Sequence, residues 1–224
     1  MFRRVGGLRV ALAALLIGVS GATMGMTMAQ AEEDVEQPHY DVVDTVGAIE
    51  IRQYGPRLAA EADMGPGTGV DSGQYSAFMT LAAFIFAENR AGPEVAMTAP
   101  VAVEEANAPI AMTAPVAMEP GESGRVMRFF MPAEYTMETL PKPGDDRVRI
   151  VTVPEQTLAV LRFSGIADDA VVERRTAELL AGLEGSTWEP VGKPGYFGYD
   201  PPMTPPDERR QEVFVEVAPI DTTK

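Results

Sequence analysis

The sequence Ala96-Met97-Thr98-Ala99-Pro100-Val101-Ala102 returns unchanged fifteen residues later, at residues 111–117. Chance does not produce a seven-residue repeat. Both copies are uncharged, and the connector at residues 103–110 carries two glutamates and an asparagine, so the pattern predicts a β-hairpin with a polar turn. Because proline cannot donate a hydrogen bond to a sheet, we expect Pro100 and Pro115 at strand ends or where the chain leaves the sheet.

The segment that precedes the repeat predicts a helix without charge. Its apolar residues recur at helical spacing over about residues 74–89, no charged residue occurs in 75–87, and Gly92-Pro93 ends it. The side toward the sheet is expected to hold Phe78, Leu81 and Ile85. The opposite side is expected to present Tyr75, Met79, Ala82 and Phe86. A helix that is apolar all round must be covered on both sides. The cover is either the repeat as part of the core, a partner chain or a flat apolar ligand.

The same order of elements occurs twice along the chain, about a hundred residues apart. The first half, about residues 45–131, predicts strands at 49–54, 58–62 and 125–131 around the uncharged helix. The second half, about residues 145–217, predicts strands at 148–153, 158–163 and 212–217 and a helix at 168–183 that begins at Asp168 or Asp169. Two such pseudo-symmetric halves predict an α+β domain, in which a curved antiparallel sheet carries one helix from each half.

The first 31 residues predict a secretory signal peptide. Three arginines precede an apolar stretch at residues 10–19, and Ala29-Gln30-Ala31 forms a small-x-small cleavage site before an acidic run. The alternative is an uncleaved N-terminal membrane anchor, because weakly apolar residues continue to Met28 and give about 20 in a row. Glycine, serine and threonine in the second half favour cleavage after Ala31, and a periplasmic or secreted protein with no stable membrane insertion. The rest then divides into a flexible lead-in at 32–39, the domain at 40–218 and a tail at 219–224.

Composition excludes several classes of partner and site. Removing residues 1–31, which hold three Arg and no acid, leaves 15 basic and 33 acidic residues and a net charge of −18. Nucleic acid is excluded as a partner, because phosphate binding needs clustered Lys and Arg. The chain has no Cys, which excludes disulfides and thiolate metal sites, and the single His39 excludes a metal centre with several histidines.

Several segments resemble the SOUL haem-binding protein family, in the order in which the family has them. They are the Ile/Val-Ala-Met-Thr-Ala-Pro-Val tracts at 95–101 and 110–116, the strand at 49–54, the helix ending near Asn89, Phe129-Phe130-Met131-Pro132, Gly198-Tyr199-Asp200-Pro201-Pro202-Met203 and Arg209-Arg210-Gln211-Glu212-Val213. The resemblance covers about residues 40–217 and implies a distorted β-barrel of two βαββ halves. The same fold occurs in gyrase-inhibitor-like and bacterial effector-binding domains, so the fold alone does not identify the ligand.

The resemblance also implies a shallow apolar groove beside the first helix, where haem or another tetrapyrrole is held. The residues expected to line it are Tyr75, Phe78, Met79, Ala82, Phe86, Arg90, Met97 and Met112. Some family members are linked to haem through a histidine near this helix, which this chain lacks, and Arg90 is the cation placed to meet a propionate. We therefore expect weak or no axial ligation, with Tyr75 or a methionine as the axial candidate, and a porphyrin that is not tightly held or is absent altogether.

Two other classes of function stay open. Glu212 lies in a predicted central strand, where it is expected to be an exposed carboxylate; the alternative is an inward carboxylate that meets a cationic ligand or a Lys/Arg partner and serves an effector-binding-type hydrolase. A structural or partner-binding domain without a small ligand is the remaining class. Of the individual residues, Asp200 is expected to hold a turn, Trp188 to anchor packing, and Met97 with Met112 to suit Cu(I) if a metal binds.

Overall fold

Alternating apolar and polar residues along each strand build one antiparallel sheet with two different faces. The computed structural model describes residues 35–65, 73–86, 110–121, 124–201 and 203–220. Its strands are β1 (Tyr40–Val46), β2 (Ile49–Tyr54), β3 (Arg57–Asp63), β4 (Val116–Gly121), β5 (Gly124–Phe130), β6 (Arg149–Val153), β7 (Gln156–Ser164), β8 (Trp188–Pro190), β9 (Gly195–Gly198) and β10 (Arg210–Pro219). Its helices are α2 (Gly73–Ile85) and α3 (Asp169–Leu183).

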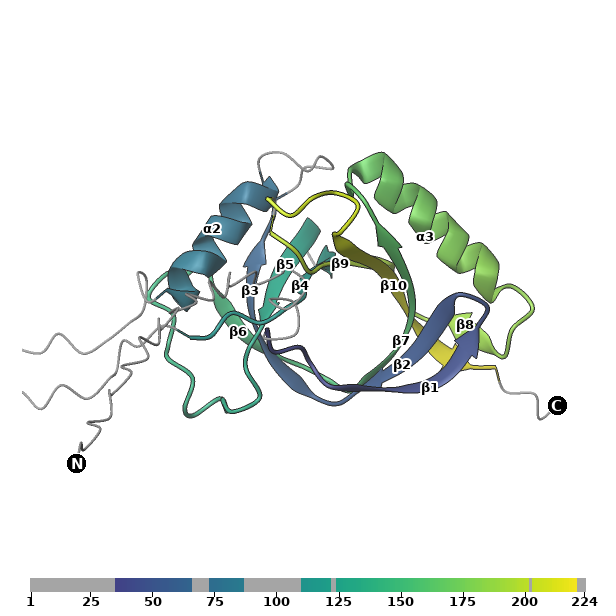
Figure 1. Cartoon of the computed structure of the whole chain (residues 1–224). Coiled ribbons are helices and arrows are strands. Elements are labelled where there is room, and N and C mark those ends of the chain that lie inside the picture. Colours follow the sequence, from purple (N-terminus) through teal and green to yellow (C-terminus); the bar gives the residue numbers. More distant parts are fainter. Residues whose placement is uncertain (1–34, 66–72, 87–109, 122–123, 202, 221–224) are drawn as a thin grey trace, which may run out of the picture. The chain divides into compact units, whose positions relative to one another are not determined.

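The strands curl into a half-barrel with both helices on its outside (Figure 1). Their order across the sheet is β1-β2-β7-β10-β9-β4-β5-β3-β6, and β8 pairs with β10. On one side of the central β9–β4 pair the order is β2-β7-β10-β9, and on the other it is β6-β3-β5-β4, so equivalent elements of the two halves take equivalent places. The predicted α+β fold with two helices on a curved antiparallel sheet is confirmed, whereas the internal repeat of the two halves stays a prediction.

The two faces of the sheet form two separate cores. The outer face packs under the helices, where Val213, Val215 and Val217 of β10 join residues of both helices such as Phe84 and Leu179. The inner, concave face holds a smaller aromatic core around Phe130, Phe197 and Phe214, in which the rings of Phe197 and Phe214 stack 4.0 Å apart. Because side chains alternate along a strand, residue 212 must point to the same concave side as Phe214.

The expected strands and helices are present with small shifts at their ends, and the structure adds strands β1, β8 and β9, which the sequence did not predict. Strand β2 has the expected limits, and α3 begins after Asp168, whose side chain accepts a 2.8 Å hydrogen bond from the Val171 backbone. The first copy of the repeat lies outside the described residues. In the second copy, residues 111–115 are not in a strand and β4 begins only at Val116, so the described arm of the expected hairpin is shorter than expected. Pro115 lies directly before β4, as expected of a proline at a strand end. Helix α2 ends at Ile85, and the residues expected to extend it beyond Phe86 lie outside the described residues.

The segment expected to be a flexible lead-in is tied to the domain at two residues. The Glu36 carbonyl accepts a 3.0 Å hydrogen bond from the Ala114 backbone, and its carboxylate accepts one of 2.7 Å from the Ala133 backbone. The side chain of Gln37 accepts a 3.1 Å hydrogen bond from Arg210. Residues 36 and 37 therefore contact the domain at the rim of the curl.

Strand β1 forms one edge of the sheet. Its pairing with β2 shifts register between Val42 and Asp44, which is a β-bulge, and Val42 and Val43 are exposed. In the described parts of the chain, neither helix has the length and apolar character that a membrane crossing requires.

Candidate functional site

Helix α2 and the residue directly after it expose three large apolar side chains, which we call the α2 face: Tyr75 and Met79 in the helix and Phe86 after it. Their exposed fractions are 67%, 47% and 52%. Nearby positions are less accessible, since Ala82 is buried and Phe78 packs its ring 5.4 Å from that of Phe129. The structure thus brings three of the predicted groove residues together on the surface and places two others in or near the core.

The second copy of the repeat lies at the C-terminal end of this helix. The Ile110 backbone donates a 3.0 Å hydrogen bond to the Ile85 carbonyl, and the Ile110 side chain is buried. Two residues further along the chain, Met112 has an exposed side chain. The predicted groove residues Arg90 and Met97 lie outside the described residues, so Met112 is the one methionine of the two predicted repeat methionines that the structure describes.

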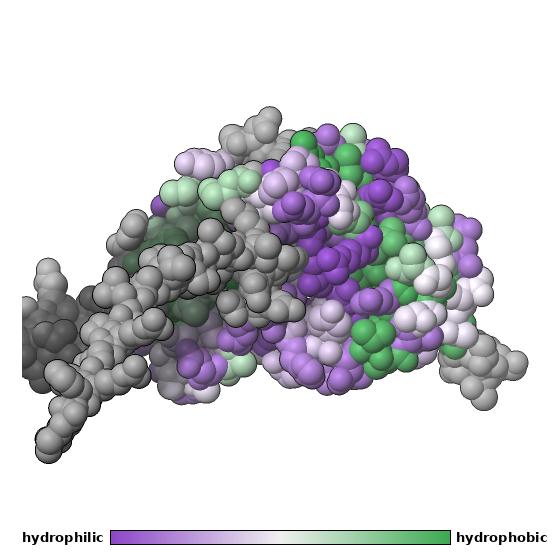
Figure 2. Space-filling model, in the orientation of Figure 1, coloured by the Kyte–Doolittle hydropathy of each residue, from purple (hydrophilic) through white to green (hydrophobic). Residues whose placement is uncertain are grey.

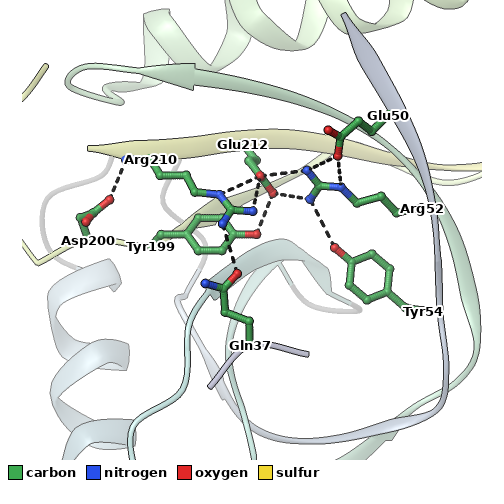
Figure 3. Close-up of polar contacts among 8 residues, drawn as sticks. All are labelled: Gln37, Glu50, Arg52, Tyr54, Tyr199, Asp200, Arg210 and Glu212. Atoms are coloured by element: carbon green, nitrogen blue, oxygen red, sulfur yellow. Dashed lines mark hydrogen bonds and ion pairs between the residues drawn. The ribbon is translucent and has the colours of Figure 1, made fainter. Parts of the chain in front are cut away.

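A polar cluster lies on the concave face of the sheet, and we name it the Glu212 cluster: Arg52, Tyr199, Arg210 and Glu212 (Figure 3). Glu212 is fully buried, so the expectation of an exposed strand carboxylate is wrong. Its oxygens accept two bonds from Arg52, of 2.8 and 3.1 Å, and two from Arg210, of 3.0 and 2.8 Å. The hydroxyl of Tyr199 donates a fifth bond of 2.7 Å. The alternative expectation, an inward carboxylate that meets an arginine partner, is confirmed.

The charge of Glu212 is compensated within the protein. Burial by itself raises the pKa of this carboxyl, but the hydrogen bonds and positive charges of Arg52 and Arg210 outweigh burial and hold the pKa below its ordinary value. Both guanidinium groups also stack on rings: Arg52 on Tyr40 at 4.5 Å and Arg210 on Tyr199 at 3.8 Å. A general base needs a free lone pair and a pKa near the working pH, and Glu212 offers neither.

The other half of the concave face holds a second compensated cluster. Glu61 is buried and accepts a 2.8 Å bond from Arg128 and a 2.9 Å bond from Arg149. Arg128 also pairs with Glu119, and Arg149 pairs with Asp63 at 2.8 Å. The buried carboxylate of Glu61 is therefore compensated by two arginines, Arg128 and Arg149.

The space between these clusters is filled by side chains. The void bounded by residues such as Tyr40, Tyr54, Phe130 and Tyr199 measures about 10 Å³, no more than one water occupies. Figure 2, in the orientation of Figure 1, shows mostly hydrophilic side chains over the middle of this side of the molecule, where the ribbon drawing leaves an opening. Around this void the concave face is therefore packed with aromatic side chains between charged groups, and an aromatic ligand does not fit into the void itself.

Metal ligands do not gather in the described part of the chain. Among those residues no group of three or more His, Asp or Glu side chains could hold an ion. His39 is exposed and lies 3.9 Å from the Asp41 carboxylate. The copper hypothesis rests on Met97, which lies outside the described residues, and it stays a prediction.

Two structural roles expected from the sequence are confirmed. The carboxylate of Asp200 accepts a 2.6 Å hydrogen bond from the Arg210 backbone and so holds the turn before β10. The half-buried indole of Trp188 packs against the outer core and donates a 2.8 Å bond to the Asp44 carboxylate. Sequence reasoning missed Arg52 and Tyr199 as partners of Glu212, because Arg52 lies on β2 and Tyr199 directly after β9, and only the folded sheet brings these segments to β10.

Comparison with known proteins gives a family and a fold. The model of the family described as SOUL heme-binding protein matches residues 35–216. No curated protein matches the sequence.

Among solved structures, the C-terminal domain of EcmrR is similar with a TM-score of 0.53 and 9% identity, covering 81% of this chain and 99% of that one. An uncharacterized conserved protein from Listeria innocua has a TM-score of 0.52 and 14% identity and covers 76% and 92%. A hydrolase from Listeria innocua has a TM-score of 0.50 and 13% identity and covers 76% and 91%. At these identities the solved structures show the fold alone.

Proposed function

Because the chain belongs to the SOUL heme-binding protein family, we propose that it binds haem or a related tetrapyrrole on the α2 face. The observation that supports this site is the exposure of Tyr75, Met79 and Phe86 on one side of an uncharged helix. Three large apolar side chains gathered on one surface are typical of a site that a ligand or partner covers. A porphyrin is a flat apolar ring system of matching character.

The packed concave face supports the same choice by elimination. Its buried carboxylates Glu212 and Glu61 are paired with arginines, and the void beside Tyr54 and Phe130 is about 10 Å³. A cationic ligand would have to displace Arg52 or Arg210 from Glu212, which leaves a buried charge without a partner and costs several kcal/mol. The hydrolase alternative has the same difficulty, since Glu212 would have to leave both arginines to take a proton.

Binding on this face is expected to be weak and reversible. The α2 face offers two side chains that could ligate iron, the thioether of Met79 and the phenol of Tyr75. His39 is not part of this face. Apolar burial contributes about 25 cal/mol per Å², and association costs of several kcal/mol must be subtracted. The result is affinity on the order of micromolar rather than a permanently held cofactor.

The test is a titration with hemin followed by absorbance. We expect the purified protein to be largely colourless and to give a saturable Soret shift. Replacing Met79 or Phe86 by Glu places a charge on the α2 face and is expected to weaken binding at least tenfold. The matched control is Val191→Glu, which changes an exposed apolar residue near β8, and it is expected to bind as the wild type does.

A second control separates the α2 face from the histidine. His39→Ala is expected to change the affinity little, because His39 lies ahead of β1 and outside the α2 face. A titration without saturation contradicts tetrapyrrole binding. A titration that is lost in His39→Ala and kept in Phe86→Glu contradicts the proposed position of the site.

A further inference from the structure

A groove outside both the α2 face and the Glu212 cluster lies at the rim of the curl, and we call it the Arg57 groove. It measures about 540 Å³, within the range of about 300–1,000 Å³ that small-molecule sites occupy. Three parts of the chain form most of it: residues 36–39, the β2–β3 turn with the start of β3, and residues 131–137 after β5. The lining is mixed, with apolar Leu58, Met131 and Met137 beside polar groups.

Arg57 gives this groove a positive charge that no described carboxylate meets within ion-pair distance, although the charge of Glu119 acts on it from further away. Arg52, Arg128 and Arg149 each lie within ion-pair distance of a carboxylate, whereas no described carboxylate lies that close to Arg57. Its guanidinium donates to the Gly55 carbonyl at 3.3 Å and to the Gln156 side chain at 3.1 Å. A guanidinium has five N–H donors, so donors remain for a further acceptor.

Two aromatic rings and partial burial hold this cation in place. The guanidinium carbon lies 4.5 Å from the centre of the Tyr54 ring and 4.9 Å from that of Phe130. The Arg57 side chain is half-buried, and this burial lowers its pKa although the nearby Glu119 raises it. A partly dehydrated, pre-oriented guanidinium is the arrangement that binds a carboxylate well.

The other ionisable groups of the groove do not neutralise Arg57. Glu36 is exposed at the rim, and its carboxylate accepts the Ala133 backbone hydrogen bond. His39 is exposed as well and faces the Asp41 carboxylate. The lining of the groove therefore combines one arginine with apolar side chains such as Leu58, Met131 and Met137.

We propose that the Arg57 groove binds a small apolar molecule that ends in a carboxylate, with Arg57 receiving the carboxylate and Leu58, Met131 and Met137 contacting the apolar body. This site is independent of tetrapyrrole binding on the α2 face. It requires an anionic head group and an apolar chain in one ligand, and it does not require a ring system.

The test compares three probes with the same chain and different heads: decanoate, decanol and decylamine. Calorimetric titration at neutral pH is expected to show saturable binding of decanoate, at least fivefold weaker binding of decanol and no binding of decylamine. Arg57→Met is expected to weaken decanoate at least tenfold, and Arg57→Lys less. The matched control is Arg175→Met, because Arg175 also stacks on a ring, Phe163 at 5.4 Å, but pairs with Glu178 and lies outside the groove.

A surface variant keeps the test decisive if Arg57→Met does not fold. Met137 is exposed, and Met137→Glu puts a negative charge in the groove, so decanoate affinity is expected to fall at least fivefold. Met203→Glu, which changes an exposed methionine outside the groove lining, is expected to leave it unchanged. Equal binding of decylamine, or unchanged decanoate affinity in Met137→Glu, overturns the proposal. Hemin binding is expected to survive Met137→Glu and to fail in Phe86→Glu, so the two proposals fail separately.

Discussion

At the scale of single residues, Glu212 shows how a buried charge becomes part of the framework. It lies on β10, the strand with partners on both sides near the middle of the half-barrel, and arginines from β2 and from β10 itself surround it. Removing one partner of a buried ion pair leaves the other dehydrated and unpaired, which is strongly destabilising. The cluster therefore ties β2 to β10 across β7.

We expect Glu212→Gln to lower the free energy of unfolding by about 3–5 kcal/mol at pH 7, measured by urea denaturation. The control Glu178→Gln removes an exposed ion pair with Arg175 and is expected to cost no more than about 1 kcal/mol. A loss in Glu212→Gln as small as in the control contradicts the framework role.

The same variant is expected to change how stability depends on pH. The folded pKa of Glu212 is lowered, so its contribution is present above the ordinary pKa of 4.5 and is lost as pH falls through the folded value. Unfolding of the wild type between about pH 5 and 3 is therefore expected to show a steeper loss of stability than unfolding of Glu212→Gln. Parallel curves would mean that Glu212 has the same pKa in both states.

The sequence could predict part of this residue-level picture. The run of valines at 213, 215 and 217 places Glu212 on the opposite face of the strand, and that inference holds. The burial of Glu212 could not be predicted, because it depends on the curl of the sheet and on Arg52, 160 positions away in the chain. The idea of an exposed carboxylate came from one strand considered alone.

At the scale of elements, the two helices differ in their N-terminal capping and in how their buried residues are distributed. Helix α3 has Asp168 as its N-cap, and its buried residues include Leu179 and Leu183 with polar residues elsewhere. Helix α2 has no acidic residue in its first turn and no basic residue in its last, and six of its 13 residues are buried. The periodicity of charges was enough to predict α3 to within one residue, while α2 had to be inferred from apolar residues and a Gly-Pro stop.

We expect Asp168→Ala to lower the free energy of unfolding by about 1 kcal/mol, because the Val171 backbone N–H loses its partner at the helix start. Asp168→Ser keeps a capping oxygen and is expected to lie within a few tenths of a kcal/mol of the wild type. Thermal and urea unfolding of the three proteins measure the difference. Equal losses for Ala and Ser would show that the charge matters and the cap does not.

At the scale of the whole molecule, the order of elements along the sequence predicted the fold well, because strand, strand and helix follow one another twice in the structure. Strand, strand and helix recur in both halves, and the family resemblance drawn from the repeat and the Gly198–Met203 segment agrees with the match over residues 35–216. The hairpin expected from the repeat was less well predicted, since the second copy enters the sheet only at Val116. Apolar composition and proline positions restrict where a strand ends, but contacts with Ile85 and residue 36 determine the path of residues 110–115.

We also propose that residues 1–31 form a signal peptide and that the protein reaches the periplasm. Because Ala29-Gln30-Ala31 is a small-x-small site after an apolar stretch, the exported protein is expected to begin at Glu32. Intact-mass measurement of protein from the periplasmic fraction tests this. A full-length species that stays with membranes after carbonate extraction contradicts it.

The bulge in strand β1 has a consequence for protein molecules at high concentration. An edge strand with exposed valines is a template for a strand of another molecule, but the register shift between Val42 and Asp44 breaks the even spacing that a partner strand would need. Asp41 and Asp44 add carboxylates to this edge, and the hydrogen bond from Trp188 lowers the pKa of Asp44, so its charge persists in mild acid. The irregular, charged edge thereby protects the chain against amyloid-like stacking of one copy on the next.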